Sequence, residues 1–109
     1  MDVVAVLRDL DADEVLVGGN CGVYEGAIIR ERAVLAAGVI VTGGTPVYDV
    51  VRGEVLRRQP GGPLEIPAGA VVVPGARAIR QGKGAEWGLS LQTPVIVKYR
   101  DAKTDLSAT

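Results

Sequence analysis

The strongest constraint on this chain is a six-residue period that recurs in seven units. The units read VGGNCG, VYEGAI, IRERAV, LAAGVI and VTGGTP from Val17 to Pro46, then IPAGAV and VVPGAR from Ile66 to Arg77. The first position is always aliphatic, at Val17, Val23, Ile29, Leu35, Val41, Ile66 and Val72. The fourth position is Gly in every unit except two, which have Asn20 and Arg32, and Gly accepts a positive φ at little cost. We therefore expect the backbone to bend at every sixth residue.

The fifth position of each unit is small or compact. It holds Cys21, Ala27, Ala33, Val39, Thr45, Ala70 and Ala76. Because this position lies two residues before the next aliphatic one, both side chains face the same side of a strand. Short flat sides joined by bends, each with an inward aliphatic residue, predict an all-β solenoid of stacked hexapeptide rungs, a parallel β-helix. A Gly-rich sandwich with chance spacing is the alternative, and the number of matches disfavours it.

Composition narrows the possible functions of the 109-residue chain. Phe is absent and aromatic residues make up only 4%, which suits the narrow interior of a β-helix. The net charge of −1 indicates no nucleic-acid partner, and no apolar run approaches the ~20 residues that span a membrane. The single cysteine, Cys21, cannot form an internal disulfide and occupies an inward position. A lone cysteine is typical of a reducing compartment, so we expect a cytoplasmic protein.

The distribution of the repeat divides the chain into three segments. Residues 1–14 lack it and form an irregular N-terminal segment. Residues 15–80 form the hexapeptide β-helix, interrupted by an inserted hairpin loop at 48–65 that turns at Arg52-Gly53. Residues 81–109 comprise the Gly-rich loop QGKGAEWG, a long C-terminal strand over Leu89–Arg100, and a truncated helix start.

The sixth position of each unit should point outward, yet it is repeatedly apolar. It holds Ile28, Val34, Ile40 and Val71, among others. Apolar residues on the outer face of a β-helix need a second surface to cover them. Neighbouring subunits of a cyclic oligomer would supply that surface, and the inserted hairpin or the final strand is the alternative.

The absence of histidine excludes several kinds of chemistry. It removes Ser–His and Cys–His nucleophile pairs, a histidine base and histidine metal ligands, and we expect no metal site. Carboxylates, backbone amides and basic side chains remain. Arg77, Arg80 and Lys83 gather beside Gly-rich turns, which suits a phosphate-bearing ligand, although a solvated basic loop would have the same spacing. Glu25 lies at a corner and, as a bare residue, is more typical of solvated surface than of a catalyst.

Three longer segments resemble a known family. GGNCGVYEGAIIRERAVLAAGVIVTGGTPVYD, IPAGAVVVPGARAI and EWGLSLQTPVIVKYRDAKTD closely resemble the C-terminal part of tetrahydrodipicolinate N-succinyltransferases, over about Glu14 to Asp105. The resemblance implies a left-handed β-helix, an exception to right-handed crossovers, and a homotrimer with active sites between subunits. It also implies succinyl transfer from succinyl-CoA, a co-substrate and not a bound cofactor, to the amine of ring-opened tetrahydrodipicolinate in lysine biosynthesis.

The resemblance also assigns candidate site residues. It places Gly38, Gly69, Ala70, Gly75 and Ala76 along the pantetheine arm of CoA, and Arg77, Arg80 and Lys83 at its phosphates or in the terminal loop. Glu25 of VYEG matches a glutamate of the family motif and is the candidate catalytic base.

The sequence departs from the family pattern at several points. Some branches have a catalytic glutamate where this chain has Gly22, so either Glu25 or another group acts as the base. The N-terminal domain and earlier coils of the family are missing, and we expect a C-terminal portion that is inactive alone. Two alternatives stay open: an acetyl-CoA-dependent acyltransferase, and a non-catalytic β-helix module that only oligomerises.

Overall fold

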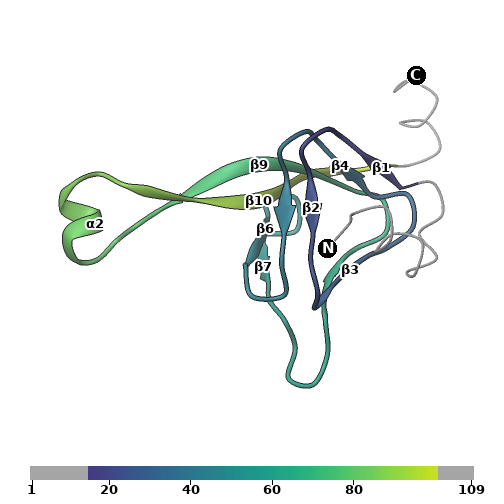
Figure 1. Cartoon of the computed structure of the whole chain (residues 1–109), viewed down its shortest axis with the longest axis horizontal. Helices are drawn as coiled ribbons and strands as arrows, with labels where there is room; N and C mark the ends of the chain where they lie inside the picture. The colour runs from purple at the N-terminus through teal and green to yellow at the C-terminus, as the bar shows by residue number, and fades with distance from the viewer. Residues whose placement is uncertain (1–14, 101–109) are drawn as a thin grey trace.

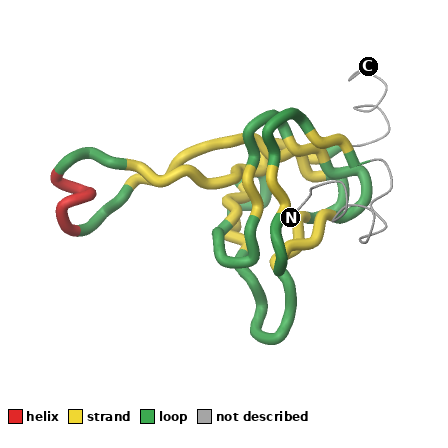
Figure 2. The backbone as a smooth tube through the Cα atoms, in the orientation of Figure 1, coloured by secondary structure: helices red, strands yellow, loops and turns green. Residues whose placement is uncertain are grey.

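The computed structural model describes residues 15–100, where short strands and tight turns predominate (Figure 1, Figure 2). The first strands are β1 Leu16–Val17, β2 Gly22–Val23, β3 Ala27–Ile29, β4 Val34–Leu35 and β5 Ile40–Val41. They are followed by β6 Val47–Asp49, β7 Glu54–Leu56, β8 Leu64–Ile66, β9 Ala70–Ala78, the helix α2 Gly82–Glu86 and β10 Ser90–Tyr99. The irregular segment expected at 1–14 and the helix start expected near Thr104 lie outside the described residues.

The short strands stack as a coil with a period of 18 residues, or three hexapeptides. Leu16 lies opposite Val34 in the parallel pair β1–β4, and Gly22 lies opposite Ile40 in the parallel pair β2–β5. The third side pairs β3 with β8, again in parallel. Strands that pair in parallel without an intervening helix require the chain to wind around a common axis. The expected all-β coil of hexapeptide rungs is therefore confirmed, whereas its left-handed sense stays a prediction.

The first repeat position lines the interior of this coil. Val23, Ile29, Val41, Ile66 and Val72 are 0% exposed and Leu35 is 1% exposed. Among the fifth positions, the side chains of Ala27, Ala33, Val39 and Ala70 also belong to the core, and Cys21 packs against it. The Cys21 thiol donates a hydrogen bond to the carbonyl oxygen of Ala36 at 3.1 Å, as suits a structural thiol. Inward packing of aliphatic residues is the main source of stability in such a coil.

The corners follow the fourth repeat position in five of the seven units. Positive φ values occur there at Asn20, Gly26, Arg32, Gly38 and Gly69. Arg32 departs from the glycine pattern yet has a φ of 65°, and the Arg100 guanidinium donates to its carbonyl oxygen at 2.9 Å. Gly44 and Gly75 do not adopt a positive φ, so the prediction of a positive-φ bend is wrong at those two positions. At Gly44, the Thr42 hydroxyl instead accepts hydrogen bonds from the amides of Gly44 and Thr45.

An inserted hairpin interrupts the second turn of the coil. Strands β6 and β7 pair antiparallel, with Asp49 opposite Glu54, and Gly53 in their turn has a φ of 68°. The chain then returns through a loop to β8, which restores the third side of the coil by pairing with β3. The hairpin predicted around Arg52-Gly53 is therefore present, and the returning loop projects from the coil at the bottom of Figure 1.

Strands β9 and β10 form a long antiparallel hairpin with α2 at its tip, which we call the arm. It pairs from Ser90 opposite Ala78 to Tyr99 opposite Ala70 and extends away from the coil (Figure 1). The base of β10 also pairs in parallel with β6 and places Ile96, which is 0% exposed, in the core. The predicted C-terminal strand is therefore confirmed, and it closes one end of the coil.

Two local expectations are wrong in the arm. The unit VVPGAR does not form a rung, because β9 runs straight for nine residues and Ala76 is exposed instead of facing the interior. Cross-strand pairing with β10 replaces the bend there, with Gly75 opposite Thr93. The segment predicted as a Gly-rich loop contains α2, a single helical turn that connects the two strands of the arm.

Candidate functional site

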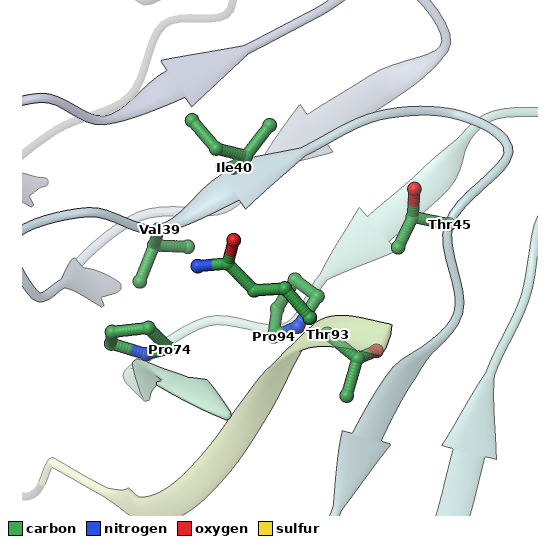
Figure 3. A pocket seen from close by; sticks show the side chains of 7 residues that line it. Val39, Ile40, Thr45, Pro74, Thr93 and Pro94 are labelled. Carbon is green, nitrogen blue, oxygen red and sulfur yellow. The ribbon is translucent and has the colours of Figure 1, made fainter. Parts of the chain in front are cut away.

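A pocket of about 220 Å³ lies where the arm leaves the coil, and we call it the arm-base pocket (Figure 3). It is lined by Val39, Ile40, Thr45, Pro74, Gln92, Thr93 and Pro94. Pro74 and Pro94 lie opposite each other in the arm, so neither contributes an amide donor to this surface. Ile40, one of the outward apolar residues, is 39% exposed and lines this pocket. Four of the seven lining residues are apolar, and Thr45, Gln92 and Thr93 add polar groups.

A larger hollow of about 650 Å³ follows the arm outward, and we call it the arm groove. It is lined by Tyr48, Ala76, Arg77, Ala78, Ile79, Arg80, Gln81 and Leu91. The structure therefore brings together three of the predicted site residues, Ala76, Arg77 and Arg80. The Gln92–Ala76 cross-strand pair joins the two hollows, because Gln92 lines the arm-base pocket and Ala76 lines the arm groove.

Lys83 lies apart from the two arginines. It is on α2, where its ammonium pairs with Glu86 at 3.1 Å and its side chain is 70% exposed. An exposed ion pair of this kind contributes little to stability. The charge of Lys83 is thus partly compensated within α2, and the basic character of the arm groove comes from Arg77 and Arg80.

The structure separates the other small residues predicted to line a ligand. Gly38 lies in the corner between β4 and β5, whereas Gly69 lies in the corner between β8 and β9. Gly69 faces the Arg100 carbonyl oxygen, 3.2 Å from where a Cβ would stand. The Ala70 side chain is 0% exposed and packs in the core, and Gly75 lies against Val95 in the arm. These residues therefore do not form one continuous wall within a single chain.

Glu25 is exposed at the corner between β2 and β3, and this corner stacks on the next turn. The backbone of Glu25 and Gly26 contacts Gly43, where a Cβ would stand 3.0 Å from the Gly26 Cα. Beside this contact lies a third hollow of about 300 Å³, the corner pocket, lined by Gly43, Gly44, Thr45, Pro46, Arg57 and Arg58. Sequence reasoning missed Arg57 and Arg58, because they belong to the insertion and approach the corner only through the fold.

A buried polar cluster fixes the insertion to the arm. The Asp49 carboxylate, 2% exposed, accepts hydrogen bonds from the Tyr99 hydroxyl and from the amides of Val51 and Arg52, the latter two at 3.0 Å. The Arg52 guanidinium lies 4.1 Å from the centre of the Tyr99 ring. The Thr93 hydroxyl donates to the Pro46 carbonyl oxygen at 2.8 Å nearby. The sequence offered no periodic signal for this cluster.

Burial and hydrogen bonding shift the pKa values of both acids in the cluster. Burial alone would raise the pKa of Asp49, but the hydrogen bonds from Tyr99, Arg52 and Val51 outweigh it and lower the pKa below 3.8. Burial, together with the hydrogen bond to Asp49, raises the pKa of Tyr99 from 10.0 to about 12. Asp49 is therefore ionised and Tyr99 neutral at pH 7, which suits a structural hydrogen bond.

Across residues 15–100, no group of three or more metal-ligating side chains gathers in one place. No helix in that range has the length and hydropathy needed to cross a membrane.

Comparison with known proteins identifies the repeat. Residues 13–43 match the family model described as the hexapeptide repeat of succinyl-transferase. This match covers the first turn of the coil and strands β4 and β5 of the second, including the corners at Gly26 and Gly38.

Curated relatives align over most of the chain. A 2,3,4,5-tetrahydropyridine-2,6-dicarboxylate N-succinyltransferase of Maricaulis maris is 42% identical over 105 residues, which are 91% of this chain and 34% of the relative. Enzymes of the same name from Aromatoleum aromaticum and Brucella ovis are 44% and 38% identical over 92 residues, 84% of this chain and 30% of each relative. The chain thus spans about a third of the length of these relatives. The resemblance expected from the sequence is confirmed.

Proposed function

We propose that this chain, a relative of the tetrahydropyridine-2,6-dicarboxylate N-succinyltransferases, is the C-terminal coil portion of a CoA-dependent N-succinyltransferase of lysine biosynthesis. The observation that carries the proposal is the 42% identity that extends over 91% of the chain. The aligned region includes the insertion and the arm as well as the repeats, whereas the match to the repeat model ends at residue 43.

The two hollows along the arm support binding of an acyl-CoA. The arm-base pocket combines apolar and polar side chains, which suits the methylene and amide groups of the pantetheine chain, and Gln92 offers hydrogen bonds to those amides. The arm groove adds Arg77 and Arg80, whose guanidinium groups suit the CoA phosphates. In this proposal Gly38, Gly69 and Gly75 contribute where subunits meet, and Lys83 contributes through the tip of the arm.

The proposed reaction is direct acyl transfer. The acceptor amine attacks the thioester carbonyl, so that a C–N bond forms, the C–S bond breaks and CoA leaves as the thiol. A carboxylate takes the proton from the amine and passes it to the departing sulfur, and Glu25 is the candidate for this role. Backbone amides at a corner of the coil stabilise the developing oxyanion.

We extend the proposal to assembly and location. A homotrimer of left-handed coils places one subunit's arm against its neighbour and covers apolar residues such as Ile28 and Val34, which are half-buried in the single chain. A mass of three chains by light scattering supports this assembly, and a monomer contradicts it. The cytoplasmic location expected from the single cysteine belongs to the same proposal.

Calorimetric titration with CoA tests the proposed function. We expect binding with a dissociation constant on the order of 1 µM, and weaker binding by at least about tenfold when Arg77→Gln and Arg80→Gln are combined. Lys98→Gln is the control, because this exposed lysine of β10 lies outside both hollows of the arm and should change affinity less. Absence of CoA binding would instead favour a non-catalytic β-helix module. Succinyl-CoA and acetyl-CoA, compared in the same titration, distinguish the two acyl groups.

A further inference from the structure

The corner pocket has the composition of an anion site. Two consecutive arginines, Arg57 and Arg58, follow β7 and meet the turn Gly43–Pro46 of the coil. Within residues 15–100, neither guanidinium forms an ion pair with a carboxylate. The nearby Glu65 pairs instead with Arg30. Two adjacent positive charges therefore share a concave surface that has no carboxylate among its lining residues.

The fold orients Arg58 toward this corner. Its Nε donates to the Gly62 carbonyl oxygen at 3.0 Å, and the Gly62 amide donates in turn to the Gln59 carbonyl oxygen at 2.9 Å. Its Nη1 lies 3.2 Å from where a Cβ at Gly26 would stand. Because guanidinium has five N–H donors, the bond to Gly62 orients this exposed side chain and leaves the remaining donors for a ligand. The side chain is thus held at the corner that Glu25 and Gly26 form.

The size of the corner pocket limits its ligand. About 300 Å³ is at the lower end of the range for small-molecule sites and accommodates a small acid more readily than a nucleotide. A carboxylate matches the planar fork of an arginine in a bidentate pair. The relatives are named for a dicarboxylate substrate and a succinyl group, so both partners of their reaction carry free carboxylates.

We propose that Arg58, assisted by Arg57 and the turn Gly43–Thr45, binds a substrate carboxylate at the corner that carries Glu25. This inference rests on the proposed function, because it names the substrate group that the reaction would hold there. Arg57 also lines the adjacent hollow beside Glu54 and Glu65, so its contribution should be smaller than that of the oriented Arg58. Placing a carboxylate here brings the dicarboxylate or succinyl chain beside the candidate base.

Nuclear magnetic resonance of the ¹⁵N-labelled full chain, titrated with succinate at constant ionic strength, tests the inference. We expect saturable shifts of the Gly43, Gly44 and Thr45 amides and of the Arg58 Nε–H signal, with a dissociation constant on the order of 1 mM. Arg58→Gln should weaken binding by at least about tenfold, the effect of one charge-assisted hydrogen bond, and Arg58→Lys should restore only part of it.

Lys98→Gln is the control, since it removes the same charge from an exposed position of β10 outside the three hollows and should leave succinate binding unchanged. Absence of saturable shifts, or equal weakening by Lys98→Gln, would overturn the proposal. Stronger shifts with phosphate or CoA at the same signals would also overturn it, because the pocket would then hold phosphate. Binding of CoA in the arm groove is measured separately. Failure to bind succinate alone would contradict this inference, whereas failure to bind CoA alone would contradict the proposed function. The spectrum of each variant verifies that it is folded.

Discussion

The coil and the elements that close it are held together by different forces. The coil buries aliphatic side chains such as Ile29, Leu35 and Val41 at 0–1% exposure, and its corners stack backbone on backbone. The inserted hairpin and the arm also meet through the polar cluster of Asp49 and Tyr99, which lie 50 residues apart in the sequence. The apolar coil thus depends on a repeated local rule, whereas its closure adds long-range hydrogen bonds to the apolar packing of Ile96.

The largest effect is expected in the coil interior. Leu35→Ala removes a side chain that is 1% exposed, and should lower the free energy of unfolding by about 2–5 kcal/mol. Leu91→Ala, on the arm and 46% exposed, is the matched control and should change stability by less than about 0.5 kcal/mol. Urea unfolding followed by circular dichroism measures both. Similar losses for the two variants would show that the arm contributes as much to stability as the coil does.

The next largest loss of stability is expected where the corners of successive turns stack. A Cβ at Gly18 would stand 2.6 Å from the backbone nitrogen of Ala37 in the next turn, so Gly18→Ala forces the two turns apart. We expect a loss of about 1–3 kcal/mol, the usual range for overpacking. The neighbouring Gly19 has nothing within 4 Å of its Cβ position, and Gly19→Ala should be close to neutral. Thermal unfolding of the pair measures the contact, and a neutral Gly18→Ala would mean that the turns do not stack as described.

The closing elements should respond to loss of the buried hydrogen bond. Tyr99→Phe leaves the Asp49 carboxylate without one of its donors and should cost about 1–3 kcal/mol. Tyr48→Phe on the adjacent strand is the control for loss of a tyrosine hydroxyl. Hydrogen exchange should show faster exchange in β6, β7 and the base of β10, with the coil amides unchanged. Equal acceleration throughout the coil would contradict the separation of the two regions.

The same cluster sets a pH dependence. Because the pKa of Asp49 is lowered in the folded state, its contribution is present above the unfolded value of 3.8 and is lost as pH falls through the folded value. Because the pKa of Tyr99 is raised to about 12, its contribution is present below 10.0 and is lost as pH rises toward 12. Unfolding measured across both ranges should show these losses in the natural chain, and Tyr99→Phe should lack the alkaline one.

The contrast also explains what the sequence could predict. The rule of one aliphatic residue every six positions was sufficient to identify the coil and its core, including Val23 and Ile66, because each rung repeats the same local geometry. The straight course of β9 through Gly75 was not predictable in this way, since cross-strand pairing with β10 overrides the local pattern. Arg32 is the opposite case, because it lacks the expected glycine and still has the positive φ that the corner requires.

The candidate site likewise contains residues that the local sequence predicted and residues that only the fold brings together. Arg77 and Arg80 were found by their charge and neighbouring glycines, and the structure places them in one groove. Arg57 and Arg58 belong to an insertion without periodicity, and only the folded chain brings them to the corner beside Glu25. Ala70 fits the repeat pattern equally well as a core residue, which is the position it occupies. Spacing therefore locates rungs reliably, but it does not decide which outward residues share a surface.

The smallest change in stability is expected from a pair of glycines that differ in backbone conformation but not in packing. Gly38 and Gly44 occupy the fourth position of adjacent units, and a Cβ at either would have nothing within 4 Å. Only Gly38 has a positive φ, of 85°. Gly38→Ala should therefore cost about 1 kcal/mol through backbone strain alone, whereas Gly44→Ala should be neutral or slightly stabilising. Equal costs in thermal unfolding would mean that glycine at the fourth position serves something other than the bend, and the repeat rule would then need a different physical basis.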